Sequence, residues 1–155
     1  MGRLGGIARH DRSRGPIETL DHVSVTRALG VHGDLRGAIR PGKSGRRQIS
    51  LIEAESWQAA LADLRLSADQ ILPWHVRRAN LLVEGIRLPR EAGRIITIGK
   101  TLRIEVTCEC DPCSRMDEIL PGLKAALLPD WRGGVLGRVL ADGDIAVGDE
   151  VRIEQ

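Results

Sequence analysis

The segment GRIITIGKTLRIEVT, residues 93–107, contains two short apolar runs separated by a glycine. In the second run Leu102, Ile104 and Val106 alternate with other residues, so these side chains share one face of a strand. A later segment, GDIAVGDEVRI (143–153), repeats the order of strand, glycine and strand, and both segments contain the pattern apolar-Gly-x-x-apolar-Arg-Ile. Glycines between short strands are typical of the corners of a curved sheet. We therefore predict a closed or strongly coiled β-sheet.

The rest of the chain supplies more strands than helices. The runs LDHVSV (20–25), QISLI (48–52) and NLLVEGI (80–86) are rich in branched aliphatic residues, which favours strands. The clearest helix is EAESWQAALADLRL (53–66), with apolar side chains on one face and acidic residues in its first turn. Segment 30–48 carries five glycines and is predicted to be loop. The expected fold class is mainly β, a barrel-like domain with a few peripheral helices.

The length of 155 residues predicts one domain that covers residues 1–155. Within residues 1–15 we expect a short edge strand at LGGIA (4–8), followed by a flexible stretch rich in Arg and Gly. The chain contains no Phe or Tyr and only three Trp, so the core must be built from Leu, Ile, Val and Ala.

Charge and composition argue against several classes of partner. The net charge of +2 is too small for a general attraction to nucleic acid or membranes, and RNA binders usually stack bases on aromatic side chains that are scarce here. The N-terminus lacks the apolar run of a secretory signal, and no run approaches the length of a membrane span. We expect a cytoplasmic protein without a specific nucleic-acid or membrane partner.

One loop carries a local excess of basic residues. Between Arg27 and Arg47 the chain has six basic residues and a single acid, Asp34. A local basic field on an almost neutral protein suits a small anion better than a long polyanion. The alternative is a solvated basic loop, which charge alone favours equally.

All three cysteines lie in TCECDPCSRM (107–116), directly after a predicted strand. Asp111 is a suitable N-cap and Pro112 a suitable first residue for a helix that follows. Cys113 would then be the second helical residue, where the helix dipole and the nearby Arg115 favour a thiolate. This makes Cys113 the candidate nucleophile or soft-metal ligand.

Four interpretations of the cysteines remain open from the residues alone. Structural zinc needs four ligands, so a distant histidine would have to join the three thiolates. A thiol–disulfide pair, Cys110 and Cys113, has the right spacing but lacks the thioredoxin-like surroundings that usually accompany it. The cysteines could also be inert packing residues. The fourth interpretation, which we favour, is a single activated thiol at Cys113.

Several blocks, in this order, resemble the MOSC domain, a family named for its similarity to the C-terminal domain of molybdenum cofactor sulfurase. The resemblance covers the chain from about residue 4 to its end and is specific only when the blocks are taken together. They are GVHGDLRG (30–37), RRQISLIEAESW (46–57), PWHVRRANLLVEGIRL (73–88), GRIITIGKTLRIEVT (93–107), PCSRM (112–116) and GGVLGRVLADGDIAVGDEV (133–151).

The resemblance implies a β-rich barrel with an essential cysteine that ligates the molybdenum of the pterin cofactor or carries sulfur. The cysteine of the family's Pro-Cys element falls on Cys113, whereas Cys108 and Cys110 match no family element. Planar guanidinium groups suit the cofactor's phosphate, and an acid could accept from its pterin ring. The candidate cofactor-binding residues are Asp34, Arg36, Arg46, Arg47, Arg77, Arg78 and Arg115.

Three functional hypotheses follow. The first is a protein that binds the molybdenum cofactor and, as in characterised relatives, reduces N-hydroxylated small molecules with electrons from a donor protein. The second is a sulfur or cofactor carrier, loaded by a sulfur-donor protein, that passes its cargo to a partner enzyme. The third is a non-catalytic zinc-binding or thiol redox-sensing domain.

Overall fold

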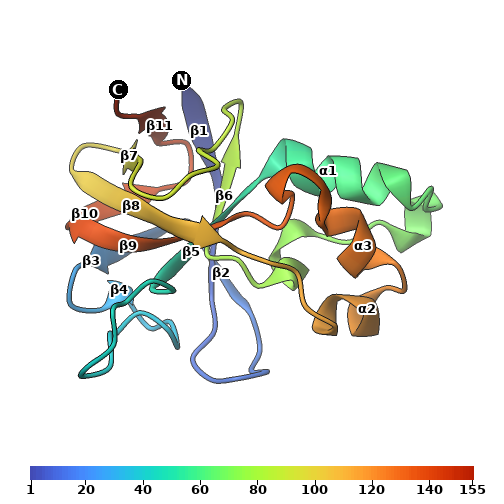
Figure 1. Cartoon of the computed structure of the whole chain (residues 1–155), viewed down its shortest axis with the longest axis horizontal. Helices are drawn as coiled ribbons and strands as arrows, with labels where there is room; N and C mark the ends of the chain where they lie inside the picture. Colours follow the sequence, from blue (N-terminus) through green and yellow to red (C-terminus); the bar gives the residue numbers. More distant parts are fainter.

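The computed structural model describes residues 1–155 and is mainly β (Figure 1). Its strands are β1 (Gly2–Arg9), β2 (Glu18–Leu20), β3 (His22–Thr26), β4 (Gly30–Val31), β5 (Ile49–Glu53), β6 (Leu81–Glu84), β7 (Ile95–Ile98), β8 (Leu102–Glu109), β9 (Val135–Ala141), β10 (Gly143–Ala146) and β11 (Glu150–Ile153).

Seven of these strands form a closed barrel. Their order is β11-β7-β8-β9-β5-β6-β1, and β1 pairs with β11 to complete the ring. Only β5 and β6 are parallel, while the other neighbouring pairs are antiparallel. Strand β2 extends from β1, and β10, β3 and β4 form a small separate sheet. The predicted fold class is therefore confirmed.

The two strand–glycine–strand segments have different roles in this fold. In the first, Gly99 adopts a φ of +65°, and β7 and β8 form an antiparallel hairpin in which Ile98 faces Leu102. In the second, Gly148 also has a positive φ, but β10 pairs with β3 whereas β11 pairs with β7 and β1. The second turn therefore carries the chain from the small sheet into the barrel.

The barrel interior is filled by aliphatic side chains, as the composition predicted. Leu102, Ile104 and Val106 of β8 are at most 1% exposed and belong to a core cluster of 19 buried residues. Burial alternates along β8 because successive side chains point to opposite faces of the sheet.

Strand β1 differs from the edge strand expected at residues 4–8. It runs from residue 2 to residue 9 and pairs with β6 on one side and with β2 and β11 on the other. Leu4, Ile7 and Ala8 are buried. At Gly6 an added Cβ would come within 2.7 Å of the Trp74 ring, so the close approach of the indole requires glycine.

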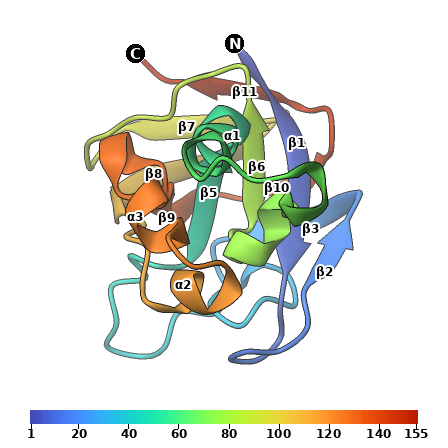
Figure 2. The same ribbon diagram turned by 90° about the vertical axis from the view of Figure 1, so that its right-hand side faces the viewer.

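The helices gather on one side of the barrel, which faces the viewer in Figure 2. They enclose a second apolar cluster with Ile52 and Trp57, whose indole N–H donates to the carbonyl of Leu72 at 3.1 Å. None of them has the length and apolar character needed to traverse a lipid bilayer. The helices are α1 (Ala54–Asp63), α2 (Arg115–Ile119) and α3 (Leu123–Leu127), with short 3-10 helices η1 (Ala68–Gln70), η2 (Trp74–Arg77) and η3 (Pro129–Trp131).

Candidate functional site

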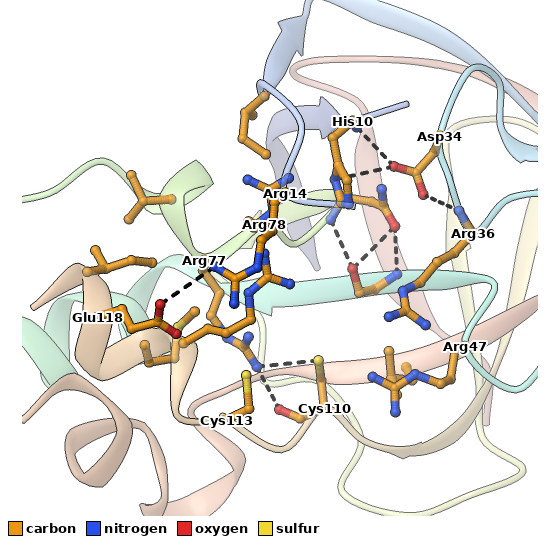
Figure 3. Close-up of a pocket in the computed structure, with 18 residues that line it drawn as sticks. His10, Arg14, Asp34, Arg36, Arg47, Arg77, Arg78, Cys110, Cys113 and Glu118 are labelled. Carbon is orange, nitrogen blue, oxygen red and sulfur yellow. Dashed lines mark hydrogen bonds and ion pairs between the residues drawn. The ribbon is translucent and has the colours of Figure 1, made fainter. Parts of the chain in front are cut away.

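A cavity of about 490 Å³ lies where the β1–β2 loop, the loop after β4, the segment from η2 to β6, and the β8–α2 connection meet (Figure 3). Six arginines line it, against two carboxylates, and two cysteines open onto it. The lining residues are His10, Arg14, Ile17, Asp34, Arg36, Arg47, Ser50, Val76, Arg77, Arg78, Asn80, Cys110, Cys113, Arg115, Met116, Glu118, Ile119 and Leu136.

The structure brings most of the predicted site residues to this cavity. Arg46 is the exception, because it lines a neighbouring hollow of the basic loop together with Arg40 and Lys43. What the cavity residues bind remains a prediction. Those that line the cavity are Asp34, Arg36, Arg47, Arg77, Arg78, Cys113 and Arg115.

Cys113 is an exposed thiol at the cavity, but it is not the second residue of a helix. Helix α2 begins at Arg115 with Ser114 as its N-cap, so Cys113 lies before it. The carbonyl of Cys113 accepts a hydrogen bond from the Met116 N–H at 3.0 Å. The predicted helical position of Cys113 is therefore wrong. Its side chain instead shares the cavity with six arginines.

Cys110 also lines the cavity, although the sequence singled out Cys113 alone as the working thiol. Its half-buried sulfur accepts a hydrogen bond from Nη2 of Arg77 at 3.4 Å, and its carbonyl accepts from the same nitrogen at 2.9 Å. Cys108 lies outside the cavity lining. No three His, Cys, Asp or Glu side chains are grouped so that they could hold a metal ion, which weighs against the zinc alternative.

Arg77 is a buried cation without a carboxylate partner. The residue is 8% exposed, makes no ion pair, and its Nε has no hydrogen-bond acceptor. Burying a charge is costly unless another group compensates it. The hydrogen bonds to Cys110 are the contacts that hold this guanidinium at the cavity.

Arg78 adds a second concentration of positive charge. It adopts a left-handed conformation with a φ of +69° at the end of η2, and its Nη2 donates to the carbonyl of Gly15 at 2.7 Å. Burial and the positive charges of Arg115 and Arg14 lower the pKa of Arg78, against the opposing effect of Asp34. Neighbouring arginines repel one another, and a bound anion would reduce this repulsion.

Asp34 shapes the loop rather than pointing freely into the cavity. Its side chain is only 2% exposed and accepts hydrogen bonds from the backbone N–H groups of His10 at 3.2 Å and Arg36 at 3.3 Å. The His10 ring lies 3.8 Å from the same carboxylate. Burial and the positive charge of Arg78 lower the pKa of His10, so its imidazole is neutral near neutral pH.

Asn80 and Ser50 hold together the strands beneath the cavity. The Asn80 side chain accepts from the Ser50 N–H at 3.0 Å and donates to the carbonyl of Ala8 at 3.2 Å, which connects three adjacent strands of the barrel. Asn80 is 4% exposed. These two polar residues, together with His10 and Arg14 of the N-terminal loop, were not predicted from the sequence.

A family model described as the MOSC domain matches residues 28–152. The chain belongs to the MOSC domain family. The match includes the barrel strands from β5 onward and the cysteine segment, and it confirms the resemblance drawn from the sequence blocks. Members of this family are known for binding molecules related to the molybdenum cofactor.

Solved structures share the fold of this MOSC domain at low sequence identity. The YuaD protein of Bacillus subtilis is 20% identical with a TM-score of 0.81, over 98% of this chain and 94% of that one. YiiM from Escherichia coli is 16% identical with a TM-score of 0.69, over 99% and 70% of the two chains. YiiM from Geobacillus stearothermophilus is 17% identical with a TM-score of 0.63, over 99% and 73%. No curated protein matches this MOSC domain.

Proposed function

We propose that this MOSC domain binds the molybdenum cofactor in the arginine-lined cavity, with the thiolate of Cys113 as a ligand of molybdenum. The observation that supports this most strongly is that one exposed thiol and six guanidinium groups share a single cavity. Soft metals favour thiolate ligands, and guanidinium groups suit phosphate. The residues present therefore fit both ends of a phosphate-bearing cofactor that carries a soft metal.

The arginines would have separate tasks in this proposal. The positive charges of Arg115 and Arg14 both act on Arg78, and this group suits the cofactor's phosphate, although Arg14 also lies 3.6 Å from the Glu118 carboxylate. Arg36 and Arg47, from the basic loop, line the same cavity and make no ion pair with a carboxylate. They remain free to donate hydrogen bonds to the ring edge of the cofactor. Arg46 is not part of this assignment, because it lines the neighbouring hollow.

When bound, the cofactor would supply oxygen-atom transfer coupled to a two-electron change, as the reduction of an N-hydroxylated substrate requires. The chain would hold the cofactor, and its neutral His10 could accept or return a proton at the imidazole. Electrons would come from a donor protein that reaches the open side of the cavity, where Cys113 is exposed.

Sulfur carriage is the second candidate function. Cys113 would accept a sulfur atom as a persulfide from a sulfur-donor protein and pass it on. The observation that favours this candidate is that a second thiol, Cys110, lines the same cavity. A persulfide is stabilised by the same positive surroundings as a thiolate.

The first test is the composition of protein purified from cells that synthesise the cofactor. We expect molybdenum by elemental analysis and pterin by fluorescence after oxidative release, both near one per chain. Cys113→Ser should lose molybdenum, whereas Cys108→Ser should retain it, since Cys108 lies outside the cavity lining. The proposal would be contradicted if the wild-type protein contained neither molybdenum nor pterin. It would also be contradicted if Cys113→Ser and Cys108→Ser contained equal amounts of molybdenum. Cyanide-labile sulfur without molybdenum would instead support sulfur carriage.

A further inference from the structure

Cys110 lines the cavity and accepts hydrogen bonds from a buried arginine, which is unusual for a cysteine that serves only in packing. Figure 3 shows the sulfur atoms of Cys110 and Cys113 on the same side of the segment that joins β8 to α2, with Arg77 donating to Cys110. The Cys110 N–H donates to the carbonyl of Gly134 at 2.9 Å, so the backbone of Cys110 is anchored to the loop before β9. Cys110 is thus a fixed thiol beside an exposed one.

The buried guanidinium of Arg77 is the second, independent observation. Arg77 is more than nine-tenths buried, lines the cavity, leaves its Nε without an acceptor and has no carboxylate partner. The Cys110 sulfur is the side-chain atom to which this guanidinium donates. A guanidinium that donates to sulfur stabilises negative charge there, and a thiolate is the form of cysteine that attacks another sulfur.

We propose that Cys110 is a resolving thiol, which discharges sulfur carried on Cys113 by forming a disulfide with it. This inference rests on the sulfur-carrier form of the proposed function and assigns a role to a cysteine that matches no family element. The two residues between the cysteines give the C-x-x-C spacing at which thiol–disulfide exchange is common.

The step is balanced without any external oxidant. The Cys110 thiolate attacks the inner sulfur of the Cys113 persulfide, so the bond between Cys110 and Cys113 forms as the bond to the outer sulfur breaks. The outer sulfur takes the electron pair of the broken bond and leaves as hydrosulfide. The carried sulfur is thereby reduced, and the two cysteine sulfurs are oxidised to a disulfide. A dithiol reductant then returns both cysteines to the thiol form for another cycle.

The test loads the reduced full-length protein with inorganic polysulfide, removes the excess, and follows hydrosulfide release and intact mass. Wild-type protein should release close to one hydrosulfide per chain and lose two free thiols. Cys110→Ser should keep the added sulfur, and its rate of hydrosulfide release should be lower than that of wild type by about tenfold or more. Cys108→Ser is the matched control, because Cys108 is also half-buried but does not line the cavity, and it should behave as wild type.

Peptide mapping gives a second measurement that needs no variant. After loading and discharge, the tryptic fragment 104–115 contains all three cysteines, and fragmentation should show a link between Cys110 and Cys113 with Cys108 alkylated. A link to Cys108, or discharge from Cys110→Ser at the wild-type rate, would overturn the resolving role while leaving sulfur carriage intact. If the wild-type protein takes up no sulfur on Cys113, sulfur carriage fails, and the resolving role fails with it.

Discussion

The substitution Glu53→Gln tests how the barrel is joined to the segments that surround it. Glu53 ends β5, is 7% exposed, and its carboxylate accepts from the Leu88 N–H at 2.7 Å, from the Ser56 hydroxyl at 2.8 Å and from the guanidinium of Arg90. Arg90 also lies 3.6 Å from Asp130. One buried carboxylate thus connects the barrel with the start of α1, the loop after β6 and η3.

The expected loss of stability follows from the charge of Arg90, which remains in the variant. Glutamine keeps the size of the side chain but leaves Arg90, whose side chain is 17% exposed, without its buried partner. Removing one member of a buried ion pair costs about 3–5 kcal/mol, and because Asp130 remains as a second partner we expect about 3 kcal/mol here. For a domain of this size that corresponds to a fall in Tm of about 6–12 °C.

The same substitution has a predicted pH dependence. Burial alone would raise the pKa of Glu53, but the hydrogen bonds from Arg90, the Leu88 N–H and Ser56 bring it below its usual value of 4.5. The carboxylate therefore stabilises the fold fully above the unfolded-state pKa, and this contribution is lost as the pH falls through the folded-state pKa. The difference between wild type and Glu53→Gln should shrink as the pH is lowered below about 4.

Urea unfolding followed by tryptophan fluorescence, at about pH 7 and at about pH 4 and below, measures both effects. Glu154→Gln is the control, because Glu154 forms an exposed ion pair with Arg103 and its loss should change stability much less. A loss below about 1 kcal/mol at neutral pH, or an equal loss at every pH, would refute the account of this carboxylate.

Three further outcomes are expected. Arg78→Ala should weaken retention of the proposed cofactor by about 10- to 100-fold, because charge-assisted hydrogen bonds contribute about 1.5–3 kcal/mol. Arg65→Ala, on the exposed surface, is the control and should retain the cofactor. The pterin content of each variant after dialysis measures the difference. Gly6→Ala should destabilise the barrel by about 1–3 kcal/mol, because the added methyl group would clash with the Trp74 indole. Gly5→Ala should cost less, because its nearest neighbour is the flexible carboxylate of Glu84. Equal melting temperatures of the two variants would contradict this. Iodoacetamide should alkylate Cys113 in the folded protein ahead of the two half-buried cysteines, as mass spectrometry of partly modified protein would reveal.

The barrel could be predicted where one physical signal decides the local structure. In β8 the alternation of Leu102, Ile104 and Val106 with exposed neighbours reflects a strand with one buried face, and Gly99 supplies the positive φ of the hairpin turn. Strand β1 gave no such signal, because three of its eight residues are glycines. Its place between neighbours depends on pairing with β6 and β11, which are far away in sequence.

The site was predictable only in part, for a similar reason. Runs of arginine and a Pro-Cys step can be recognised locally, and the residues chosen on these signals line one cavity, with the exception of Arg46. His10 and Arg14 come from a segment that looked flexible, and nothing in the local sequence indicates that it folds over the cavity. The helix start was misjudged because Asp111 and Pro112 are good first-turn residues, yet the chain delays the helix until Arg115.

The cavity is assembled from chain segments that lie more than a hundred residues apart, from His10 to Leu136. A growing polypeptide on the ribosome therefore lacks the complete cavity until the chain has emerged beyond β9 and β9 has paired with β8 and β5. If the cavity holds the proposed cofactor, the cofactor can bind in the complete cavity only after this pairing, and a product that ends before β9 lacks part of the cavity wall.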